Sequence, residues 1–376
     1  MRGVRLILGC ASFALAFSSL FAQYDVLLGD RDLERGVLRF DPSTSTTTVF
    51  GGCNVSSGLR YYYGMDFDPA TGYLWVCNTL QSRIDGLDAN GNCVGSIPTE
   101  YLPTGLAVHP NGRYAYVTTS SNVIYCYDLQ ADALPYQVEV EDASGFYGLA
   151  FSSRAEFLYV CDFYGGKLYQ FAVDNTQTPP ALRLANSVQF SQRRGYRVNP
   201  YDVAVRTSYG GRAPIDYIYV TLTTGFYGPY SEVAAGQYPY DYGNFLPEPS
   251  TFAVHPNVGS RNVSFFGIEI APDGLLWVSE YVPGGLFTVN SSGTVTQRAN
   301  YGANKLGVGI AIYQPRCVQH RGDVDNNSCV DDADLLAVLF AFGQSGSNLG
   351  RVDINCDSVV DDADLLIVLF NFGAGC

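Results

Sequence analysis

The residues best suited to carry chemistry are oxygen donors that recur in two copies of one acidic segment near the C-terminus. Calcium takes about six to eight oxygen ligands, which a twelve-residue loop supplies from positions 1, 3, 5, 7, 9 and 12. In the first copy these positions are Asp323, Asp325, Asn327, the Cys329 carbonyl, Asp331 and Asp334. In the second copy, 30 residues later, they are Asp353, Asn355, Asp357, the Val359 carbonyl, Asp361 and Asp364. The spacing therefore predicts two bound calcium ions, one in each loop.

Both copies depart from an EF-hand loop at two positions. Position 12 is Asp where EF-hands use Glu, and position 6 is Ser328 or Ser358 where glycine is usual. Glycine at position 6 allows a positive φ without strain, so the serines are expected to weaken calcium affinity. Each loop is followed by an apolar segment, Leu335–Phe342 or Leu365–Phe372, which predicts a short helix.

A duplicated loop-and-helix unit with Asp at position 12 and Asp-Leu-Leu at its end resembles the type I dockerin, over about residues 318–376. The resemblance implies docking on a cohesin, which would tether a secreted protein to a scaffold or cell surface. Partner choice in that family depends on loop positions 10 and 11, here Asp332-Ala333 and Asp362-Ala363. Because the two pairs are identical, either copy could dock by two-fold rotation. An intramolecular calcium-and-disulfide cap without a cohesin is the alternative.

The N-terminus indicates export. Arg2 and Arg5 precede a mostly apolar run, Leu6–Leu20, and we expect signal-peptide cleavage after Ala22. No other segment is long and apolar enough to span a bilayer. We therefore expect a secreted, extracellular protein of bacterial type, which the dockerin-like segment could hold at the cell surface.

The cysteine count fits an exported protein with disulfides. Ten cysteines become nine after cleavage, so at least one is free or pairs with another chain. The C-terminal segment contains four, which allow three pairings. We predict Cys317–Cys376, which would join the ends of the segment, and Cys329–Cys356, which would join the two loops.

The charge balance bears on partners. The formal net charge is −14, and residues 318–376 contribute ten Asp and two Arg. Phosphate binding needs clusters of Lys and Arg, so nucleic acid is excluded as a partner. Crowded carboxylates repel one another unless a cation neutralises them, which supports calcium in the two loops.

Residues 24–315 repeat a short glycine-apolar phrase, followed by further β-type runs and turn residues. The six copies are Tyr63-Gly-Met-Asp-Phe, Thr104-Gly-Leu-Ala-Val, Tyr147-Gly-Leu-Ala-Phe, Tyr201-Asp-Val-Ala-Val, Phe266-Gly-Ile-Glu-Ile and Val308-Gly-Ile-Ala-Ile. Four strands in about 40–45 residues are typical of a propeller blade. We predict six blades, with seven as the alternative. Tyr24–Phe50 would supply strands two to four of a blade whose first strand is Val308–Ile312.

This pattern resembles six-bladed propellers of the lactonase and NHL kind, over about residues 24–315. In metal lactonases the resemblance implies Asn or Asp ligands just before the glycine-apolar strand. The matching positions here are Tyr63, Thr104, Tyr147, Tyr201, Phe266 and Val308. None has a carboxylate or an amide, so we do not carry the activity over.

Two acidic residues occur within the repeated phrases, Asp66 and Glu269. The other phrases have alanine at this position: Ala107, Ala150, Ala204 and Ala311. Because these strands surround the propeller axis, the two carboxylates could share a cation or an ordered water network. Two solvated tunnel carboxylates are the alternative. A polar set also follows the second strand of most blades, suited to sugar or ion binding or to loop capping: Asp30, Asn78, Thr119, Asp162, Leu222 and Glu280.

Tyrosines are the expected contact residues for a propeller ligand, because they combine a flat face with a polar tip. We propose a glycan or peptide surface made of Tyr63, Tyr147, Tyr201, Tyr227 and Tyr230, against the alternative of loops that pack on themselves. Two histidines, His109 and His255, occur in Ala-Val-His-Pro-Asn turns, which favours a structural role.

The expected organisation is a mainly β chain with a small helical C-terminal domain: signal peptide 1–22, propeller 23–315, linker 316–322 and dockerin-like domain 323–376. The favoured function is a secreted, non-catalytic binding or scaffold protein, with no catalytic residues assigned. The alternative is a carbohydrate-active enzyme of polysaccharide catabolism, or a lactone-hydrolysing enzyme, that the same domain carries to its substrate.

Overall fold

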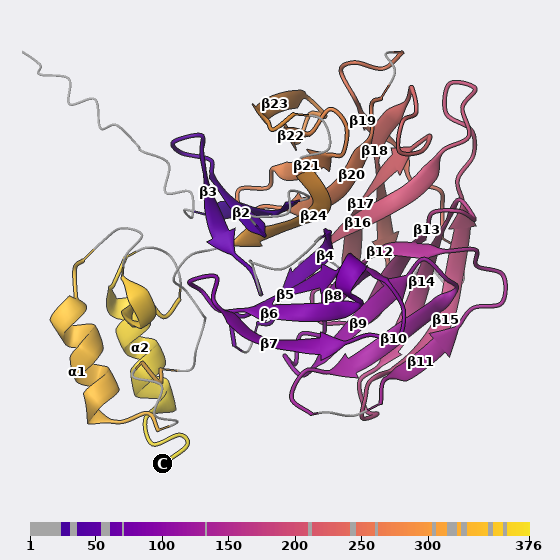
Figure 1. Cartoon of the computed structure of the whole chain (residues 1–376). Helices are drawn as coiled ribbons and strands as arrows, with labels where there is room; N and C mark the ends of the chain where they lie inside the picture. Colours follow the sequence, from indigo (N-terminus) through magenta and orange to yellow (C-terminus); the bar gives the residue numbers. More distant parts are fainter. Residues whose placement is uncertain are drawn as a thin grey trace, which may run out of the picture.

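The computed structural model of the chain describes two units, a ring of β-sheets and a pair of helices (Figure 1). The described residues are 24–30, 36–53, 61–69, 71–131, 134–209, 213–240, 246–259, 262–302, 306–313, 322–324, 329–344, 349–355 and 359–376. The predicted signal peptide, most of the predicted linker and the residues Cys317, Asp325, Asn327, Ser328, Cys356, Asp357 and Ser358 lie outside them. Within the described part of the chain, no helix is long and apolar enough to cross a membrane.

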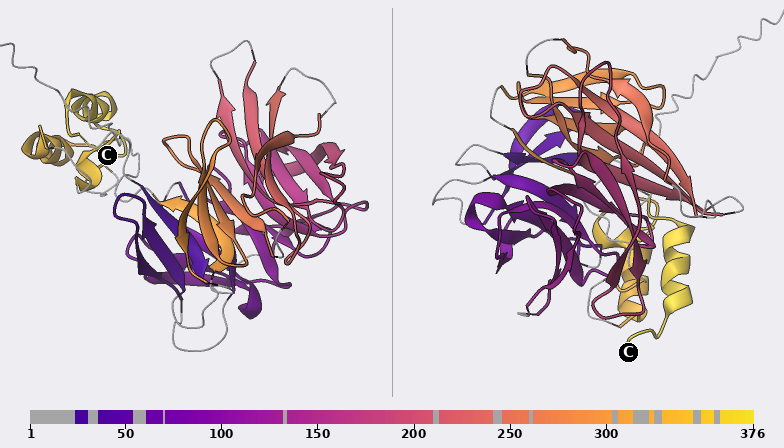
Figure 2. Two further views of the ribbon diagram at one scale, coloured as in Figure 1. Left: turned by 90° about the horizontal axis from the view of Figure 1, so that it is seen from above. Right: turned by 90° about the vertical axis from the view of Figure 1, so that its right-hand side faces the viewer.

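Six four-stranded antiparallel sheets form the blades of a β-propeller, which confirms the predicted fold (Figures 1 and 2). Five blades are made of consecutive strands: β4–β7 (Tyr62–Phe67, Leu74–Asn78, Arg83–Leu87, Cys93–Pro98), β8–β11 (Pro103–Val108, Tyr114–Thr119, Val123–Asp128, Tyr136–Glu139), β12–β15 (Phe146–Phe151, Phe157–Asp162, Lys167–Asp174, Ala181–Gln189), β16–β19 (Asn199–Ser208, Ile215–Thr223, Ser231–Pro239, Ser250–Val254) and β20–β23 (Phe265–Ile270, Leu276–Glu280, Gly285–Val289, Val295–Asn300).

The sixth blade joins the two ends of the propeller. Its order is β24 (Leu306–Tyr313), β1 (Asp25–Asp30), β2 (Val37–Asp41) and β3 (Thr46–Gly51). Val26 pairs with Ile312 and Leu28 with Ile310 in an antiparallel register. The predicted closure is therefore confirmed, and it removes a free sheet edge that could pair with another chain.

The first strand of every blade lies innermost, and the glycine of the repeated phrase allows these strands to approach closely. A Cβ atom on Gly309 would lie 1.7 Å from the Tyr63 carbonyl oxygen, and one on Gly105 would lie 2.0 Å from the Tyr147 carbonyl oxygen. Only glycine fits at such a contact without displacing the neighbouring backbone. The blade β16–β19 has Asp202 at this position in place of glycine.

The C-terminal unit consists of α1 (Asp332–Ala341) and α2 (Asp362–Asn371). Both begin three residues earlier than the predicted Leu335 and Leu365, because a capping box extends each N-terminus. The Asp331 side chain accepts from the Ala333 N–H, and the Asp334 side chain accepts from the Asp331 N–H. Asp361 and Asp364 form the same box in the second copy. Reciprocal caps satisfy backbone donors that a helix start would otherwise leave unpaired.

Backbone hydrogen bonds relate the two helical copies by an approximate two-fold arrangement. The Gly343 N–H donates to the Val360 carbonyl at 2.8 Å, and the Gly373 N–H donates to the Val330 carbonyl at 2.8 Å. Val330 and Val360 are buried in one small core with both helices. The duplicated sequence thus forms a duplicated structure.

The disulfide in this unit joins Cys329 to Cys376. Both predicted pairings, Cys317–Cys376 and Cys329–Cys356, are therefore wrong. The cause is the chain's last segment, where the Ala374 carbonyl accepts the Val330 N–H at 2.9 Å and so brings Cys376 beside Cys329.

In the propeller, a disulfide between Cys53 and Cys93 joins two neighbouring blades. Among the described cysteines, Cys77, Cys126 and Cys161 are buried free thiols. Disulfides of this kind are expected in oxidising compartments.

Candidate functional site

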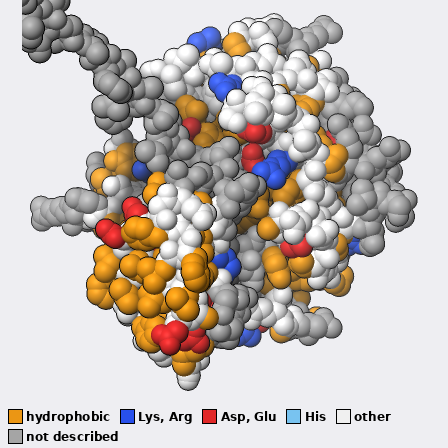
Figure 3. All heavy atoms as spheres, turned by 90° about the vertical axis from the view of Figure 1, so that its left-hand side faces the viewer, with side chains coloured by type: hydrophobic (Ala, Val, Ile, Leu, Met, Phe, Trp, Pro, Cys, Tyr) orange, Lys and Arg blue, Asp and Glu red, His pale blue; other side chains and the backbone are white. Residues whose placement is uncertain are grey.

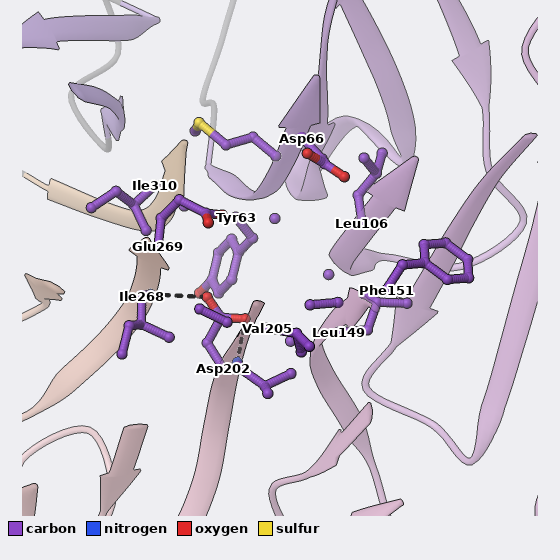
Figure 4. Close-up of a pocket in the computed structure, with 18 of the residues that line it drawn as sticks. Tyr63, Asp66, Leu106, Leu149, Phe151, Asp202, Val205, Ile268, Glu269 and Ile310 are labelled. Atoms are coloured by element: carbon purple, nitrogen blue, oxygen red, sulfur yellow. Dashed lines mark hydrogen bonds between the residues drawn. The ribbon is translucent and has the colours of Figure 1, made fainter. Parts of the chain in front are cut away.

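The innermost strands enclose a channel on the propeller axis. Its volume is about 230 Å³, and its lining comes from β4, β8, β12, β16, β20 and β24. Three carboxyl groups line it, from Asp66 on β4, Asp202 on β16 and Glu269 on β20 (Figure 4). No Lys, Arg or His is among the lining residues. The channel is therefore an acidic site without an internal counter-charge.

Asp66 joins two neighbouring inner strands through its carboxylate. Its oxygens accept the N–H groups of Val108 on β8 and of its own neighbour Phe67, both at 2.8 Å. Burial raises the pKa of Asp66 to about 6, although these two donors act in the opposite direction. The structure thus brings the predicted residue into the channel and shows its hydrogen-bond partners.

Asp202 makes the same kind of contact in the blade β16–β19. It accepts from the Ile268 N–H on β20 at 3.1 Å and from the Val203 N–H at 2.9 Å (Figure 4). Burial raises the pKa of Asp202 to about 7. Sequence reasoning missed this residue, although it is the one non-glycine at the second position of the six repeated phrases.

Glu269 is the third channel acid, and it accepts one backbone N–H, from Ile270 at 2.8 Å. Burial raises the pKa of Glu269 to about 8, and the negative charges of Asp66 and Asp202 add to the rise. The three carboxyls therefore exchange protons near neutral pH. Groups with such pKa values can act as general acids or bases, or as partners for a cation.

The predicted shared cation is not supported by a close set of ligands. Within the described residues, no group of three or more His, Cys, Asp or Glu side chains is arranged to hold a metal ion. Asp66, Asp202 and Glu269 line one channel but do not converge on one point.

An aromatic cluster packs across one end of the channel. Its centre is Tyr201, whose ring centroid lies 5.0 Å from that of Tyr147 and 4.1 Å from that of Phe266. Tyr147 and Tyr201 are 6% and 3% exposed, and Tyr63 packs partly buried against them. Three tyrosines of the predicted ligand surface therefore come together, but two of them are almost completely covered.

The other two predicted tyrosines lie apart from each other. Tyr227 is 60% exposed and contacts Tyr281 at the edge of the aromatic cluster. Tyr230 is buried in a core shared by the blades β12–β15 and β16–β19, where its hydroxyl donates to Glu232. Tyr227 can contact a ligand in this structure, whereas Tyr230 supports the fold.

Both histidines are fixed inside turns. The His109 Nδ1 accepts the Asn111 N–H at 3.2 Å, and its Nε2 faces Asn175. The His255 Nδ1 accepts the Asn257 N–H at 3.1 Å, and its Nε2 lies 2.9 Å from Glu280. These contacts agree with the structural role inferred from the sequence.

The polar residues after the second strands are buried and cap loops. Asp162 shows the pattern most fully, because it accepts the N–H groups of Ser144, Gly145 and Gly165. Asp30, Asn78, Thr119 and Glu280 are also at most 3% exposed. Of the two sequence interpretations, loop capping is the one that these contacts favour.

In the helical unit, the described residues of each predicted calcium loop lie near the start of the helix that follows the loop. Asp334, Asp353 and Asp364 are buried, and Asp331 and Asp361 serve as N-caps. Asp334 also accepts the Val324 N–H at 2.6 Å, and Asp364 accepts the Ile354 N–H at the same distance. These oxygen donors fit calcium by type. Asp323, Asn355, Cys329 and Val359 are described as well, while the remaining predicted ligands are not.

The predicted partner positions Asp332, Ala333, Asp362 and Ala363 are exposed at the helix N-termini. Next to them the structure shows an apolar surface that the sequence had not indicated. Each helix exposes a Leu, a Leu and a Phe at spacing i, i+3, i+4 and a second Phe beyond, and hydrophobic side chains accordingly gather on this face (Figure 3). The residues are Leu336, Leu339, Phe340 and Phe342 in the first copy and Leu366, Leu369, Phe370 and Phe372 in the second.

Several solved structures are similar to this chain. A chain of a nidogen/laminin complex matches 78% of this chain and 100% of its own length at 12% identity, with a TM-score of 0.52. A putative 6-phosphogluconolactonase from Bacteroides fragilis matches 78% of this chain and 99% of its own, at 15% identity and a TM-score of 0.47. Virginiamycin B lyase from Staphylococcus aureus matches 63% of this chain and 69% of its own, at 13% identity and a TM-score of 0.43.

Of these three matches, only the nidogen/laminin chain has a TM-score above 0.5, and at 12% identity it shows likeness of fold alone. No protein-family model matches the sequence, and no curated protein matches it.

Proposed function

We propose that the protein is a secreted binding propeller, displayed through a calcium-dependent docking module formed by its two helices. One observation carries the proposal, namely that the same apolar face is exposed twice. Phe340 and Phe370 are both 83% exposed, and Leu339 and Leu369 are 47% and 48% exposed. Large apolar side chains grouped on a surface are typical of protein interaction sites.

The chemistry of this face indicates the kind of partner. Residues three and four positions apart lie on one side of a helix, so each Leu-Leu-Phe set forms a continuous apolar strip. Exposed carboxylates of Asp332 and Asp362 lie at the N-terminal end of each strip. A matching partner would therefore present an apolar patch with basic residues at its edge. A cohesin-like domain is the partner class that the dockerin resemblance implies.

Calcium would hold the two helices in position. Each loop leads directly into its helix, and the position 12 residue, Asp334 or Asp364, also forms the capping box. An ion in the loop would therefore fix the helix start and the orientation of the apolar strip. We propose two ions, held by the two ligand sets predicted from the sequence.

Titration calorimetry of the mature protein against a panel of type I cohesin domains tests the proposal. We expect one cohesin to bind per chain in calcium, and binding to be lost in EGTA. Calcium calorimetry should give two sites in the wild type and none after Asp323→Ala with Asp353→Ala. Absence of calcium heat in the wild type would contradict the module, and calcium binding without cohesin binding would favour the intramolecular cap.

A second candidate function is an enzyme that cleaves a lactone or a carbohydrate. It is favoured by the raised pKa values of the channel acids, which burial brings to about 6, 7 and 8 for Asp66, Asp202 and Glu269. Acids with such pKa values can transfer protons at neutral pH. Hydrolysis of a lactone or glycan panel that disappears in Glu269→Gln would establish this function and displace the non-catalytic one.

A further inference from the structure

The propeller channel has features of a binding site, although its lining includes no histidine and its carboxyls do not form a metal site. It carries three carboxyl groups, and no basic side chain is among the residues that line it. Apolar side chains lie between these groups, with Leu149, Ile268 and Ile310 among the lining residues (Figure 4). A ligand that complements this surface has positive charge at separated points and an aliphatic body between them.

We propose that the channel binds a small aliphatic diamine, whose two ammonium groups contact the carboxyls of Asp66, Asp202 and Glu269. The channel volume of about 230 Å³ lies below the range of about 300–1,000 Å³ that suits drug-sized ligands. The carboxyls are not arranged to hold one metal ion, as far as the described residues go. Separated acids with apolar side chains between them suit an extended organic cation better than a compact ion.

A second observation points to a ligand independently of the acids. Tyr201 lines the same channel, is 3% exposed, and its hydroxyl has no hydrogen-bond partner among the described residues. A buried hydroxyl without a partner costs free energy, which a bound polar group would offset. The hydroxyl is closed to water-sized groups in the structure, so an ammonium N–H would donate to this oxygen after a small displacement of the surrounding rings.

The channel gives such a ligand a route from solvent at one end. Its lining reaches Pro110 and Ser153, which are both exposed, and the aromatic cluster around Tyr201 packs across the opposite end. A diamine would therefore enter beside Pro110 and Ser153 with its long axis along the propeller axis.

The protonation of the channel sets the pH range of binding. The pKa values of Asp66, Asp202 and Glu269 are raised by burial to about 6, 7 and 8, so these groups become negative as the pH rises through that range. Alkyl ammonium groups keep their charge there, because their pKa is near that of lysine, about 10.4. Binding should therefore strengthen from pH 5 to pH 8.

Titration calorimetry with 1,4-diaminobutane on the full mature chain tests the inference. Saturating calcium is present throughout, so that the C-terminal loops do not contribute. We expect 1:1 binding at pH 8 that is at least about tenfold weaker at pH 5, because charge-assisted hydrogen bonds are lost. Glu269→Gln and Asp202→Asn should each weaken it by about tenfold as well. The matched control Glu141→Gln, at an exposed site, should bind like the wild type.

The ligand controls separate charge from shape. 1,4-Butanediol has the same length without charge and should not bind. No heat with the diamine at pH 8, equal affinity for the diol, or unchanged binding in both channel variants would overturn the proposal. The pH comparison on the wild type remains decisive if a variant fails to fold.

A further experiment tests whether the channel binds a metal ion instead of the diamine. Residues 322–376 contain no Tyr or Trp, whereas Tyr63 and Tyr201 line the channel, so terbium luminescence excited through tyrosine reports on the propeller. Sensitised luminescence that is lost in Glu269→Gln and that the diamine does not displace would make the channel a metal site and overturn the inference. The docking function would stand in that case, because it depends on the helical unit alone.

Discussion

The propeller and the helical unit distribute charged and apolar groups in opposite ways. The propeller holds Asp66, Asp202 and Glu269 around its axis, without a basic residue among those that line the channel. The helical unit leaves Phe340 and Phe370 largely exposed to solvent. Each arrangement costs free energy in the protein alone, because buried carboxyls and exposed aromatic clusters are both unfavourable. This difference is the basis of our two proposals, an organic cation inside the propeller and a protein partner on the helices.

The two units differ in size, which explains why one buries carboxyl groups and the other exposes apolar side chains. Six blades bury large aromatic side chains such as Trp277 and Phe265 between sheets. The propeller is therefore stable enough to tolerate a few unfavourable groups. The helical unit has one small core, with a disulfide between Cys329 and Cys376 beside it. Small domains commonly need disulfides or metals because their cores are small. Its apolar strips lie outside this core.

The largest expected loss of stability comes from a substitution in the propeller interior. Gly309→Ala places a Cβ atom 1.7 Å from the Tyr63 carbonyl oxygen. We expect a loss of at least about 3 kcal/mol in the free energy of unfolding, or failure to fold, because two backbones must move apart. Thermal and urea denaturation of the full chain measure this. Gly95→Ala is the matched control, since nothing lies within 4 Å of its Cβ position, and a similar loss in both variants would refute the close-approach argument.

The next largest loss of stability is expected from a substitution at the start of a helix. Asp364→Ala removes the acceptor of the Ile354 and Asp361 N–H groups, which lie 2.6 and 3.0 Å away. We expect a loss of about 2 kcal/mol in the local stability of the helical unit, because buried donors are left unpaired. Hydrogen exchange of residues 359–371 measures it. Asp362→Ala, at an exposed neighbour, should change protection little, and equal effects of both variants would argue against the cap.

A smaller effect concerns the channel charge and its pH dependence. Burial raises the pKa of Glu269 from 4.5 to about 8, so the folded state binds a proton more tightly than the unfolded state. Stability from this group is complete below about pH 4.5 and is lost as the pH rises toward 8. Glu269→Gln should therefore stabilise the protein by about 1 kcal/mol or more at pH 8 and have little effect at pH 4. Melting curves across this range, without added amines, would show the opposite trend if Glu269 had an unseen counter-charge.

The smallest effect on stability is expected on the helix surface. Phe340→Ser with Phe370→Ser replaces two side chains that are each 83% exposed. Such substitutions usually change the free energy of unfolding by less than about 0.5 kcal/mol. Hydrogen exchange of α1 and α2 in calcium should match the wild type. A large loss of protection would mean that the two rings belong to the core of the unit and are not a docking face.

Much of the propeller could be predicted because its signals are local and repeated. Each blade repeats its strand and turn pattern, and the lone first-strand phrase Val308–Ile312 predicted the closure that pairs Val26 with Ile312. Asp202 was missed for a related reason. Alignment of the phrases by their apolar residues placed Asp66 and Glu269 at the same position. Asp202 instead occupies the glycine position. The effect of a side chain there becomes clear only when the structure shows that neighbouring inner strands are in contact.

The helical unit was harder to predict because its decisive contacts are non-local. The Cys329–Cys376 disulfide depends on the hydrogen bond between Val330 and Ala374, which no local pattern indicates. The helices are apolar nearly all round, so sequence alone could not distinguish a buried face from an exposed one. Only packing shows that Val338 and Val368 point inward while Phe340 and Phe370 point out.

The most direct test of the central claim compares single and double substitutions on the two apolar faces. Calorimetry would measure the binding of a cohesin that recognises the wild type, in calcium, to Phe340→Asp, Phe370→Asp and the double variant. Because the two faces are equivalent, each single variant should bind with an affinity within about twofold of the wild type, and the double variant should lose at least about a hundredfold. Undiminished binding in the double variant would contradict the proposal that these exposed faces are the docking site.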